Sequence, residues 1–523
     1  MSINCIRTLI EDANVSNPDK TALVFGNEKL TYSELFTKVN QIAYYLAELD
    51  LPRGSRIGLY SNKGIDQVIA ILAILSTNYV LVPLTKLLKP EQVEYIIGDC
   101  DIKCIITDKI KLESIEEIKF DGHIISYETS HKDLPSFEEI YKYYNKPYTC
   151  DVNGHSNAVI TYSFGLSGKP NGIVISHRNL IDSARVVSQY LHLKEDDIIS
   201  GLLIFNLDYG LNQLFCSLYK RATLALHRFV LANDFFNHII NDKITVLPLM
   251  PINISDMFDE DIYKLPSAEL LKNVRIITSS GGNLTAKMMS DIEKCFSNAK
   301  VYSMHGLTEA FRSTYLEPNQ LKIRPNSIGK AIPDVELYVI DENGNECAPR
   351  VVGELIHRGG YIYKGFWNAP KETEQRFKSI DILKNVINLE GQLRDEIVVK
   401  TGDYVYKDEE GYFYFVSRQD DMIKTRGFRV NPYEIESVIE SKFQSIEQCA
   451  VFSIENEEIE EEIVLVYSGN SELNSGEILF ELKNHLASYM LPSKIIYKKS
   501  LPLIPSDKNK INKEELKKEL KTK

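Results

Sequence analysis

Apolar and polar positions near the N-terminus predict a helix followed by a βαβ unit. One apolar stripe follows the capping-box sequence TYSE at residues 31–34, with its members at steps of three and four: Leu35, Val39, Ile42, Leu46 and Leu49. This spacing places them on one face of a helix. Residues 56–61 then predict a strand, 65–75 a helix and 79–83 a second strand whose nearly continuous apolar character suits a sheet covered on both faces.

Further apolar runs continue this alternation and predict a mostly parallel sheet in an α/β body. The runs are 103–107, 158–162, 198–203, 222–226, 244–247 and 274–278. The pattern changes between residues 350 and 420, where frequent glycines predict a distorted region of short strands, as at 353–355, 359–361 and 411–413. The segment after Arg418 predicts a helix at 432–441 and a small α+β domain, so we expect one domain at 1–418 and another at 419–523.

Composition is that of a folded globular protein, and a length of 523 residues exceeds what one hydrophobic core supports. The net charge of -13 disfavours nucleic acid or anionic lipid as a partner. No apolar run approaches the roughly 20 residues that span a bilayer, and no N-terminal signal segment is evident, so we expect a cytoplasmic location. Among the eight cysteines, Cys100 and Cys104 form the only close pair, and reduced core thiols are favoured over a metal site or a disulfide.

The sharpest local signal is the sequence YSFGLSGKPNG at residues 162–172, directly after the predicted strand at 158–162. Glycines let a backbone approach phosphate oxygens, and free amides and hydroxyls donate to the negative charge. Pro170 follows the lysine where a Walker A loop has Ser or Thr, so this is a different kind of phosphate loop. Taken alone, the segment is equally compatible with an ordinary turn.

The loop resembles the phosphate-binding loop of the AMP-forming acyl-, aryl- and aminoacyl-adenylating superfamily, whose usual pattern is YTSGTTGxPKG. Other superfamily motifs follow in the expected order across nearly the whole chain. They are LTYSEL (30–35), HGLTE (305–309), GFWNAP (365–370), TGD (401–403), SRQD (417–420) and LPL (501–503) with lysines after it. Stand-alone acyl-CoA synthetases and amino-acid–carrier-protein ligases share this pattern.

The resemblance implies ATP and Mg²⁺ as cofactors and assigns a contact to each matched residue. The residues expected at the β- and γ-phosphates are Ser163, Gly165, Ser167, Gly168 and Lys169. Those expected along the adenine are Gly281, Gly282 and Asn283, together with His305 and Gly306. Thr308 would contact the α-phosphate and Glu309 would coordinate Mg²⁺, while Asp403 and Arg418 would bind the ribose.

A catalytic lysine is expected near the C-terminus, because a point charge on a flexible stem can reach the reacting carboxylate and phosphate oxygens. Counting from the LPL motif favours Lys508, whereas the KINKxxL pattern, similar to the family's GKIDRxxL, favours Lys510. Asp420 occupies the position of the family's interdomain hinge, and Gly427 would line a tunnel for the thiol. The small domain is therefore expected to be mobile and to rotate between the two half-reactions.

The acid substrate is indicated by LDYGL at residues 207–211, which resembles the FDxSV segment of amino-acid-adenylating domains. There the aspartate pairs with the α-ammonium group, so Asp208 suggests an amino acid. A helix cap or another satisfied polar role remains the alternative for Asp208. His177, beside the loop, is expected either to gate the acid pocket or to begin a helix without a catalytic role.

The leading hypothesis is an ATP-dependent ligase that forms an acyl-AMP, from an amino acid by preference, and transfers the acyl group to the phosphopantetheine thiol of a carrier protein. An acyl-CoA synthetase acting on a fatty or aryl acid, with CoA as acceptor, is one alternative. A catalytically impaired nucleotide-binding homologue is another, because Phe164, Asn171 and His305 depart from the family pattern. Phe164 and Asn171 remove one hydroxyl donor and one positive charge from the phosphate site, and each lost charge-assisted contact costs about 1.5–3 kcal/mol of binding free energy. Slow turnover is favoured over inactivity because the other motif residues, such as Lys169, are retained.

Overall fold

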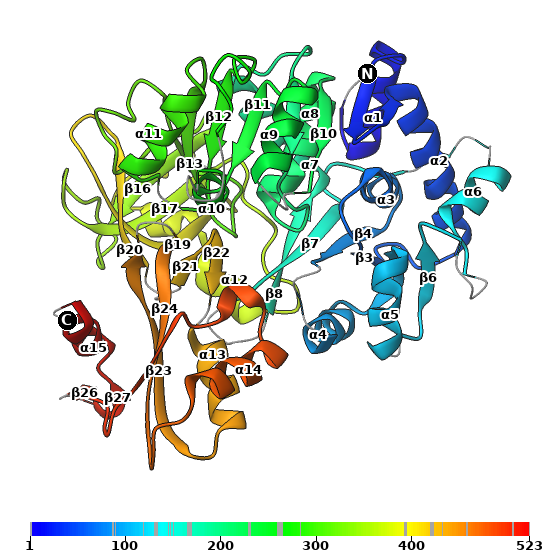
Figure 1. Cartoon of the computed structure of the whole chain (residues 1–523). Helices are drawn as coiled ribbons and strands as arrows, with labels where there is room; N and C mark the ends of the chain where they lie inside the picture. The colour runs from blue at the N-terminus through cyan, green and yellow to red at the C-terminus, as the bar shows by residue number, and fades with distance from the viewer. Residues whose placement is uncertain are drawn as a thin grey trace.

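The computed structural model describes residues 3–85, 88, 90–118, 120–129, 134–144, 146, 148–149, 151–164, 170–228, 232–258, 265–282, 284–391, 395–418, 423–430, 432–456, 459–504 and 507–521. Figure 1 shows a large α/β body and a smaller domain of orange and red segments below it. The sheet strands of the body end with β20, and those of the smaller domain begin with β21. The expected α/β fold is confirmed.

A six-stranded sheet, in the order β6-β5-β3-β4-β7-β8, forms the part of the body on the right of Figure 1. Its strands are β3 (Arg56–Tyr60), β4 (Val80–Leu84), β5 (Ile102–Thr107), β6 (His123–Ser126), β7 (Asn157–Phe164) and β8 (Pro170–Ser176). Its neighbours pair in parallel except for β7 and β8, which form an antiparallel pair around residues 165–169. The predicted phosphate loop therefore joins two paired strands.

The second sheet of the body is parallel in one half and antiparallel in the other. The parallel half is β1 (Thr21–Phe25), β9 (Ile198–Gly201), β10 (Thr223–Leu226), β11 (Val246–Leu249), β12 (Ile276–Ser279) and β13 (Lys300–His305), with β2 (Glu28–Thr31) antiparallel at its edge. The antiparallel half is β14 (Thr314–Leu316), β15 (Ser327–Ala331), β16 (Val335–Ile340), β17 (Gly353–Gly359), β18 (Phe377–Ser379), β19 (Ile397–Lys407) and β20 (Phe413–Arg418). This half is the distorted β region that the glycines predict, although residues 360–361 lie in a turn rather than in the predicted strand.

Helices cover both sheets and hold the core between them. They are α1 (Ile6–Ser16), α2 (Tyr32–Glu48), α3 (Ile65–Leu75), α4 (Pro90–Cys100), α5 (Lys109–Ile118), α6 (Phe137–Tyr143), α7 (His177–Tyr190), α8 (Asp208–Lys220), α9 (Ala232–Asn241), α10 (Pro251–Met257), α11 (Ala286–Cys295), α12 (Pro370–Arg376) and the 3-10 helix η1 (Ile380–Leu383). The predicted capping box is present: the Thr31 hydroxyl accepts from the Glu34 amide at 3.2 Å, and the Glu34 carboxylate accepts from the Thr31 amide at 2.8 Å. The predicted apolar stripe of α2 is buried apart from Leu49, which lies just beyond the helix end and is half-buried.

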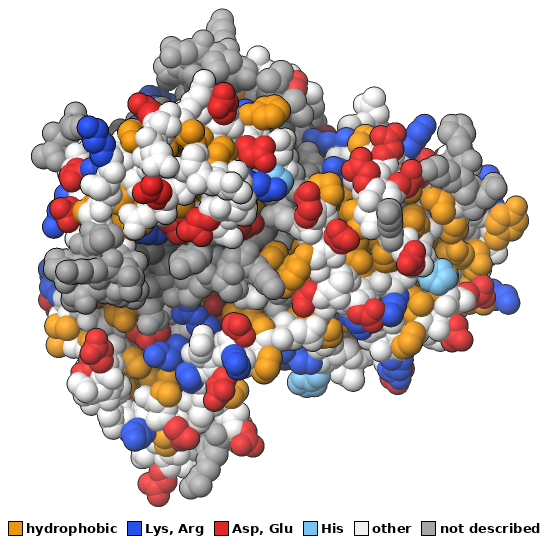
Figure 2. Space-filling model, turned by 90° about the horizontal axis from the view of Figure 1, so that it is seen from below, with side chains coloured by type: hydrophobic (Ala, Val, Ile, Leu, Met, Phe, Trp, Pro, Cys, Tyr) orange, Lys and Arg blue, Asp and Glu red, His pale blue; other side chains and the backbone are white. Residues whose placement is uncertain are grey.

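The small domain has its own five-stranded sheet of β21 (Ile423–Thr425), β22 (Phe428–Val430), β23 (Ile446–Asn456), β24 (Glu460–Gly469) and β25 (Lys494–Tyr497). Helices α13 (Pro432–Lys442) and α14 (Ser475–His485) and the 3-10 helix η2 (Ser488–Met490) accompany it, followed by the hairpin of β26 (Leu503–Ile504) and β27 (Asp507–Ile511) and by α15 (Lys513–Lys521). A separate core of side chains such as Ile435, Val451 and Leu465 stabilises it. Acidic and basic side chains are interspersed over the face seen in Figure 2.

None of the helices in the described ranges combines the length and the apolar character needed to cross a bilayer. The described cysteines are free thiols, as predicted, and both Cys100 and Cys104 are buried.

Lys63 ties the first sheet to the segment that leads into α8. Its ammonium is buried and donates to the backbone carbonyls of Gly201 and Leu202, both at 2.7 Å, and to that of Leu203. These carbonyls follow β9, five to seven residues before Asp208. A buried cation thus fixes the approach of the chain to one wall of the candidate site.

Replacing this ammonium by a thioether tests the contact. Lys63→Met leaves buried carbonyls without their donor, so we expect the free energy of unfolding to fall by about 2–4 kcal/mol. Urea unfolding followed by circular dichroism measures the loss. The matched control is Lys29→Met on the exposed side of β2, which should change stability by less than about 0.5 kcal/mol. Equal effects of the two substitutions would contradict the role given to Lys63.

Candidate active site

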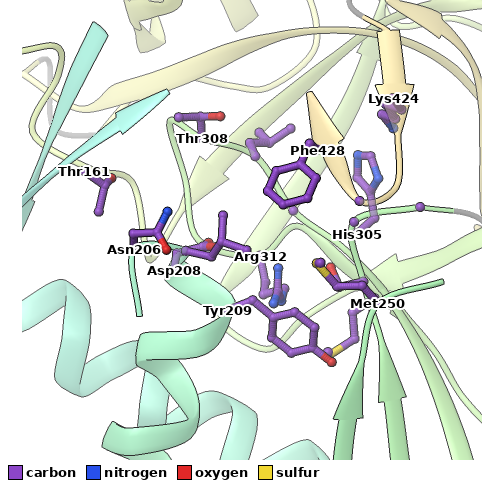
Figure 3. A pocket seen from close by; sticks show the side chains of 18 of the residues that line it. Thr161, Asn206, Asp208, Tyr209, Met250, His305, Thr308, Arg312, Lys424 and Phe428 are labelled. Carbon is purple, nitrogen blue, oxygen red and sulfur yellow. The ribbon is translucent and has the colours of Figure 1, made fainter. Parts of the chain in front are cut away.

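A cavity of about 650 Å³ lies where the carboxyl ends of the parallel strands meet the small domain. The body contributes residues after β12 and β13, such as Gly281 and Thr308, together with residues before and at the start of α8. The small domain contributes Lys424, Gly427 and Phe428. Crevices at the carboxyl ends of strands are the usual ligand sites of open α/β sheets. Figure 3 shows Asn206 and Asp208 along one wall and His305 and Lys424 along the opposite one.

Asp208 is the first residue of α8 and lines the cavity. A carboxylate there is stabilised by the positive end of the helix dipole and by the free amides of the first turn. The next residue, Tyr209, is buried, and its hydroxyl lies 2.6 Å from the Thr278 hydroxyl at the end of β12. This contact fixes the start of α8 against the parallel sheet and sets the position of Asp208.

His305 and Asp403 form a polar pair on the opposite wall. The His305 Nε2 atom lies 2.9 Å from Asp403 Oδ2, and the Asp403 side chain is fully buried. Asp403 stands opposite Arg418 in the pairing of β19 with β20, although the side chain of Arg418 is outside the described set. His305 thus contacts the carboxylate that the resemblance assigns to the ribose.

Thr308 and Glu309 follow β13 in the loop that carries the HGLTE motif. Thr308 lines the cavity, as do His305 and Gly306. Glu309 is buried, with its carboxylate 3.8 Å from the Arg376 Nε atom and its backbone carbonyl accepting from the Tyr363 amide at 3.0 Å. The loop therefore carries a hydroxyl that lines the cavity and, at the next residue, a buried carboxyl group.

The strand ends that flank the predicted phosphate loop border the same cavity. Thr161, Tyr162 and Pro170, which flank it on β7 and β8, line the cavity, and the backbone of Ser163 pairs with that of Asn171. Gly165, Ser167, Gly168 and Lys169 lie outside the described residues, as do the side chains of Ser163 and Phe164. The ends of β7 and β8 thus border the same cavity as residues of β13 and α8.

Gly427 places the backbone of the small domain against the body. It has a φ of +75°, and a Cβ atom there would lie 2.9 Å from Met250 Cε. Its carbonyl oxygen faces Gly281, where a Cβ atom would lie 3.7 Å away. Phe428 stacks on Tyr489 with ring centroids 4.0 Å apart, and both line the cavity. Two glycines therefore permit the contact that closes the cavity.

The remaining predicted residues lie elsewhere or outside the described ranges. Lys508 and Lys510 belong to β27, and Figure 1 shows the hairpin of β26 and β27 well apart from β21 and β22. Gly282 lines the cavity beside Gly281, whereas Asn283 and Asp420 are outside the described residues. In this arrangement the small domain presents Gly427, and not β27, to the cavity.

His177 begins α7 away from the described lining of the cavity. It is buried, its Nδ1 atom accepts from the Ile6 amide at 3.4 Å, and burial lowers its pKa to about 4. This position suits a neutral histidine that joins α7 to α1. The role of a pocket gate therefore finds no support in its position, and the helix-starting alternative describes it.

Sequence patterns missed several lining residues, including Asn206, Met250, Arg312 and Lys424. Arg312 follows the HGLTE motif by three residues and is buried with its guanidinium over the rings of Tyr209 and Phe311. A buried arginine directly after a nucleotide-binding motif is the signal that could have indicated it.

His357 supports the segment that carries Arg312. Its Nδ1 atom lies 3.0 Å from the Ser313 hydroxyl and its Nε2 atom 3.0 Å from the Gly360 carbonyl, so Nε2–H donates and Nδ1 accepts. Burial lowers the pKa of His357 to about 4, and the hydrogen bond to Gly360 opposes this only in part. The folded protein therefore keeps this ring neutral.

Acid should weaken the fold through this histidine. As pH falls through about 6.5, the ordinary pKa of histidine, His357 binds a proton in the unfolded chain but stays neutral in the folded protein. The contribution of His357 to the free energy of unfolding is therefore full above pH 6.5 and is lost as pH falls toward 4. We expect a loss of about 2 kcal/mol between pH 7.5 and 5.0 that is absent in His357→Gln. Urea unfolding at both pH values, with His123→Gln at an exposed position as control, measures it. An unchanged pH dependence in His357→Gln would contradict the interpretation.

The comparisons with known proteins agree with this geometry. Tyrocidine synthase 1 of Brevibacillus parabrevis is 26% identical over 509 residues, which cover 96% of this chain and 44% of that protein. The chain thus spans less than half the length of this relative.

Two solved structures share the fold. An o-succinylbenzoate CoA synthetase from Bacillus subtilis has a TM-score of 0.82 at 22% identity, with 97% of each chain covered. An artificially fused adenylation–PCP di-domain from Klebsiella oxytoca has a TM-score of 0.79 at 20% identity, with 95% of this chain and 94% of that chain covered. The family model of the AMP-binding enzymes matches residues 10–367, and the chain therefore belongs to the AMP-binding enzyme family, as its motifs predict.

Proposed function

We propose that the chain is an ATP-dependent, AMP-forming ligase that activates an amino acid as aminoacyl-AMP and transfers it to the phosphopantetheine thiol of a carrier protein. The observation that carries this proposal is the placement of Asp208 in the same cavity as Thr308 and the His305–Asp403 pair. A carboxylate at a helix N-terminus suits an α-ammonium group, and a buried carboxylate bound to an imidazole suits ribose hydroxyls. The likeness to tyrocidine synthase 1 and to an adenylation–PCP di-domain supports the carrier protein as acceptor.

In the first half-reaction a carboxylate oxygen of the substrate attacks the α-phosphorus of ATP, and the bond to the pyrophosphate leaving group breaks. Asp208 would hold the ammonium so that the carboxylate faces Thr308, which donates to an α-phosphate oxygen. Such orientation converts the encounter of two anions into a step within one complex. Lys169 and one of the two tail lysines, Lys510 or Lys508, would offset the negative charge that the two reactants share.

A Mg²⁺ ion carried with ATP would supply further positive charge to the phosphates. Thr308 and Glu309 offer the hard oxygen donors that Mg²⁺ prefers, and a site with one protein carboxylate fits an ion that keeps phosphate and water ligands. The Glu309 carboxylate lies 3.8 Å from the Arg376 Nε atom, in the loop that also carries Thr308. These residues fit a nucleotide-borne ion better than an all-protein cage.

In the second half-reaction the thiol sulfur attacks the acyl carbon, the bond from that carbon to the phosphate oxygen breaks, the thiol proton is lost and AMP leaves. The thiol needs an open route, and Gly427 would line it at the contact with Met250. The arrangement with Gly427 at the cavity and β27 away from it is the one that this step requires. A rotation about Asp420 would bring the tail lysine in for the first step.

Asp208→Asn tests the choice of an amino acid. Loss of the carboxylate leaves the α-ammonium group without its partner, and we expect the KM for the amino acid to rise about 100-fold, the equivalent of a broken buried pair. Amino-acid-dependent exchange of labelled pyrophosphate into ATP measures it, with Asp19→Asn on the exposed surface as control. The amino-acid assignment is wrong if Asp208→Asn matches the control, or if only acids without an amino group support exchange.

Gly427→Ala separates the two half-reactions. A Cβ atom there is strained at positive φ and overlaps Met250, so the arrangement with Gly427 at the cavity is disfavoured. We expect thioester formation on a phosphopantetheinylated carrier protein to fall at least about 10-fold while pyrophosphate exchange stays within about 3-fold.

The control for this change is Gly411→Ala, which has a φ of +83° but open space around its Cβ position. It should leave both half-reactions unchanged. Equal losses of exchange and thioester formation in Gly427→Ala would refute a role restricted to the thiol step. Running the acceptor assay with CoA beside the carrier protein distinguishes the two acceptors.

A further inference from the structure

Arg312 occupies an unusual position in the wall of the cavity. It is 4% exposed, lines the cavity and lies between the HGLTE motif and β14. Its guanidinium carbon is 4.7 Å from the centroid of the Tyr209 ring and 4.9 Å from that of Phe311. The two rings hold the plane of the guanidinium through cation–π contacts, which use none of its N–H groups.

Two nitrogen atoms of this guanidinium have no hydrogen-bond partner among the described residues. Its Nε and Nη2 atoms are buried without a hydrogen bond, and within the described part of the chain no carboxylate comes within 4 Å of it. The neighbouring hydroxyls serve other groups: that of Tyr209 contacts Thr278, and that of Tyr190 contacts Met304 Sδ at 3.0 Å. Arginine keeps its charge when buried, so an anion is needed to complete this site.

The rings also place Arg312 relative to the carboxylate on α8. Asp208 directly precedes Tyr209, on whose ring Arg312 packs, and both Asp208 and Arg312 line the cavity. Figure 3 shows Asp208, Tyr209 and Arg312 grouped in the cavity below Thr308. One ligand in this part of the cavity would therefore meet a carboxylate and a guanidinium together.

We propose that Arg312 is a specificity-determining residue and that the cavity selects an α-amino acid whose side chain ends in a carboxylate. Asp208 takes the α-ammonium group, the reacting carboxylate faces Thr308, and the side-chain carboxylate receives the N–H groups of Arg312. The inference rests on the proposed function, because it requires the amino acid to bind beside Asp208. A planar guanidinium matches a carboxylate with two parallel hydrogen bonds, whereas a side-chain amide supplies no counter-charge.

Recognition of a side-chain carboxylate requires the guanidinium of Arg312 to be held in one place. Hydrogen bonds fix the backbone around this residue. Ser313 bonds to His357, the Ser313 amide donates to the His305 carbonyl at 3.0 Å, and the Phe311 amide donates to the Tyr361 carbonyl at 3.2 Å. The guanidinium is thus carried by a segment held on both sides. Such support is what a preorganised recognition group requires.

The test compares amino acids that differ only by acid and amide. Pyrophosphate exchange with the wild-type chain is measured for glutamate against glutamine, for aspartate against asparagine and for 2-aminoadipate. We expect at least one acid to exceed every amide and every neutral amino acid by about 30-fold or more in kcat/KM. This comparison needs no variant and so does not depend on the folding of one.

Arg312→Met then removes the charge and keeps the length of the side chain. We expect kcat/KM for the preferred acid to fall about 100-fold and that for its amide to stay within about 3-fold. Arg312→Lys keeps a charge without the planar fork and should restore part of the preference. Arg350→Met, at an exposed arginine paired with Glu409, is the control and should change nothing.

Three results would overturn the inference. They are exchange by the wild type with neutral amino acids above all acids, an Arg312→Met variant with unchanged selectivity, and an Arg312→Met variant that loses every amino acid equally. The last would mean that Arg312 serves the reacting carboxylate. In each case exchange by the wild type with some amino acid leaves the proposed function standing. Absence of exchange with every amino acid would refute the proposed function itself.

Discussion

The contact between Gly427 of the small domain and Met250 of the body is the constraint on which the candidate site depends. A backbone with no side chain lies against the thioether, and Gly281 offers an equally bare backbone beside it. The contact closes a cavity of about 650 Å³ over the carboxyl ends of the parallel strands. The Gln92 side chain of the body also donates to the Glu434 carboxylate of the small domain at 3.1 Å.

Within that cavity, charged groups are distributed along two walls. Asp208 and Arg312 lie around Tyr209, and the His305–Asp403 pair lies opposite. Low polarisability around buried charges strengthens their interaction with a ligand and raises the cost of leaving them unmatched. The proposed function assigns an amino acid to the first wall and the sugar of a nucleotide to the second, and Thr308 lines the same cavity.

Local signals in the sequence were sufficient for much of the fold. The capping box at Thr31 and Glu34 and the apolar run of α3 gave these helices their observed starts, because both signals act within a few residues. The motifs also predicted that His305, Thr308 and Asp403 belong to one site. His305 and Thr308 line one cavity, and Asp403 contacts His305. Patterns within single segments do not determine which strands become neighbours. The sequence therefore did not predict that the parallel strands of the body form two sheets, or that the antiparallel strands continue one of them.

Arg312 was missed for a related reason. Its proposed role rests on the rings of Tyr209, about a hundred residues earlier, and of Phe311, and on the lack of a carboxylate near it among the described residues. None of these features is visible along the sequence. The orientation of the small domain was not predicted either, because the contact of Gly427 with Met250 joins residues far apart in the sequence.

The central claim is that one cavity joins an amino acid to the α-phosphate of ATP. A crystal structure of the chain after incubation with ATP, Mg²⁺ and the amino acid most active in exchange tests it most directly. The account predicts an aminoacyl-adenylate in the cavity, with its ammonium at Asp208, its phosphate at Thr308 and its ribose hydroxyls at Asp403. Unreacted ATP bound elsewhere, or an adenylate whose ammonium faces away from α8, would contradict it.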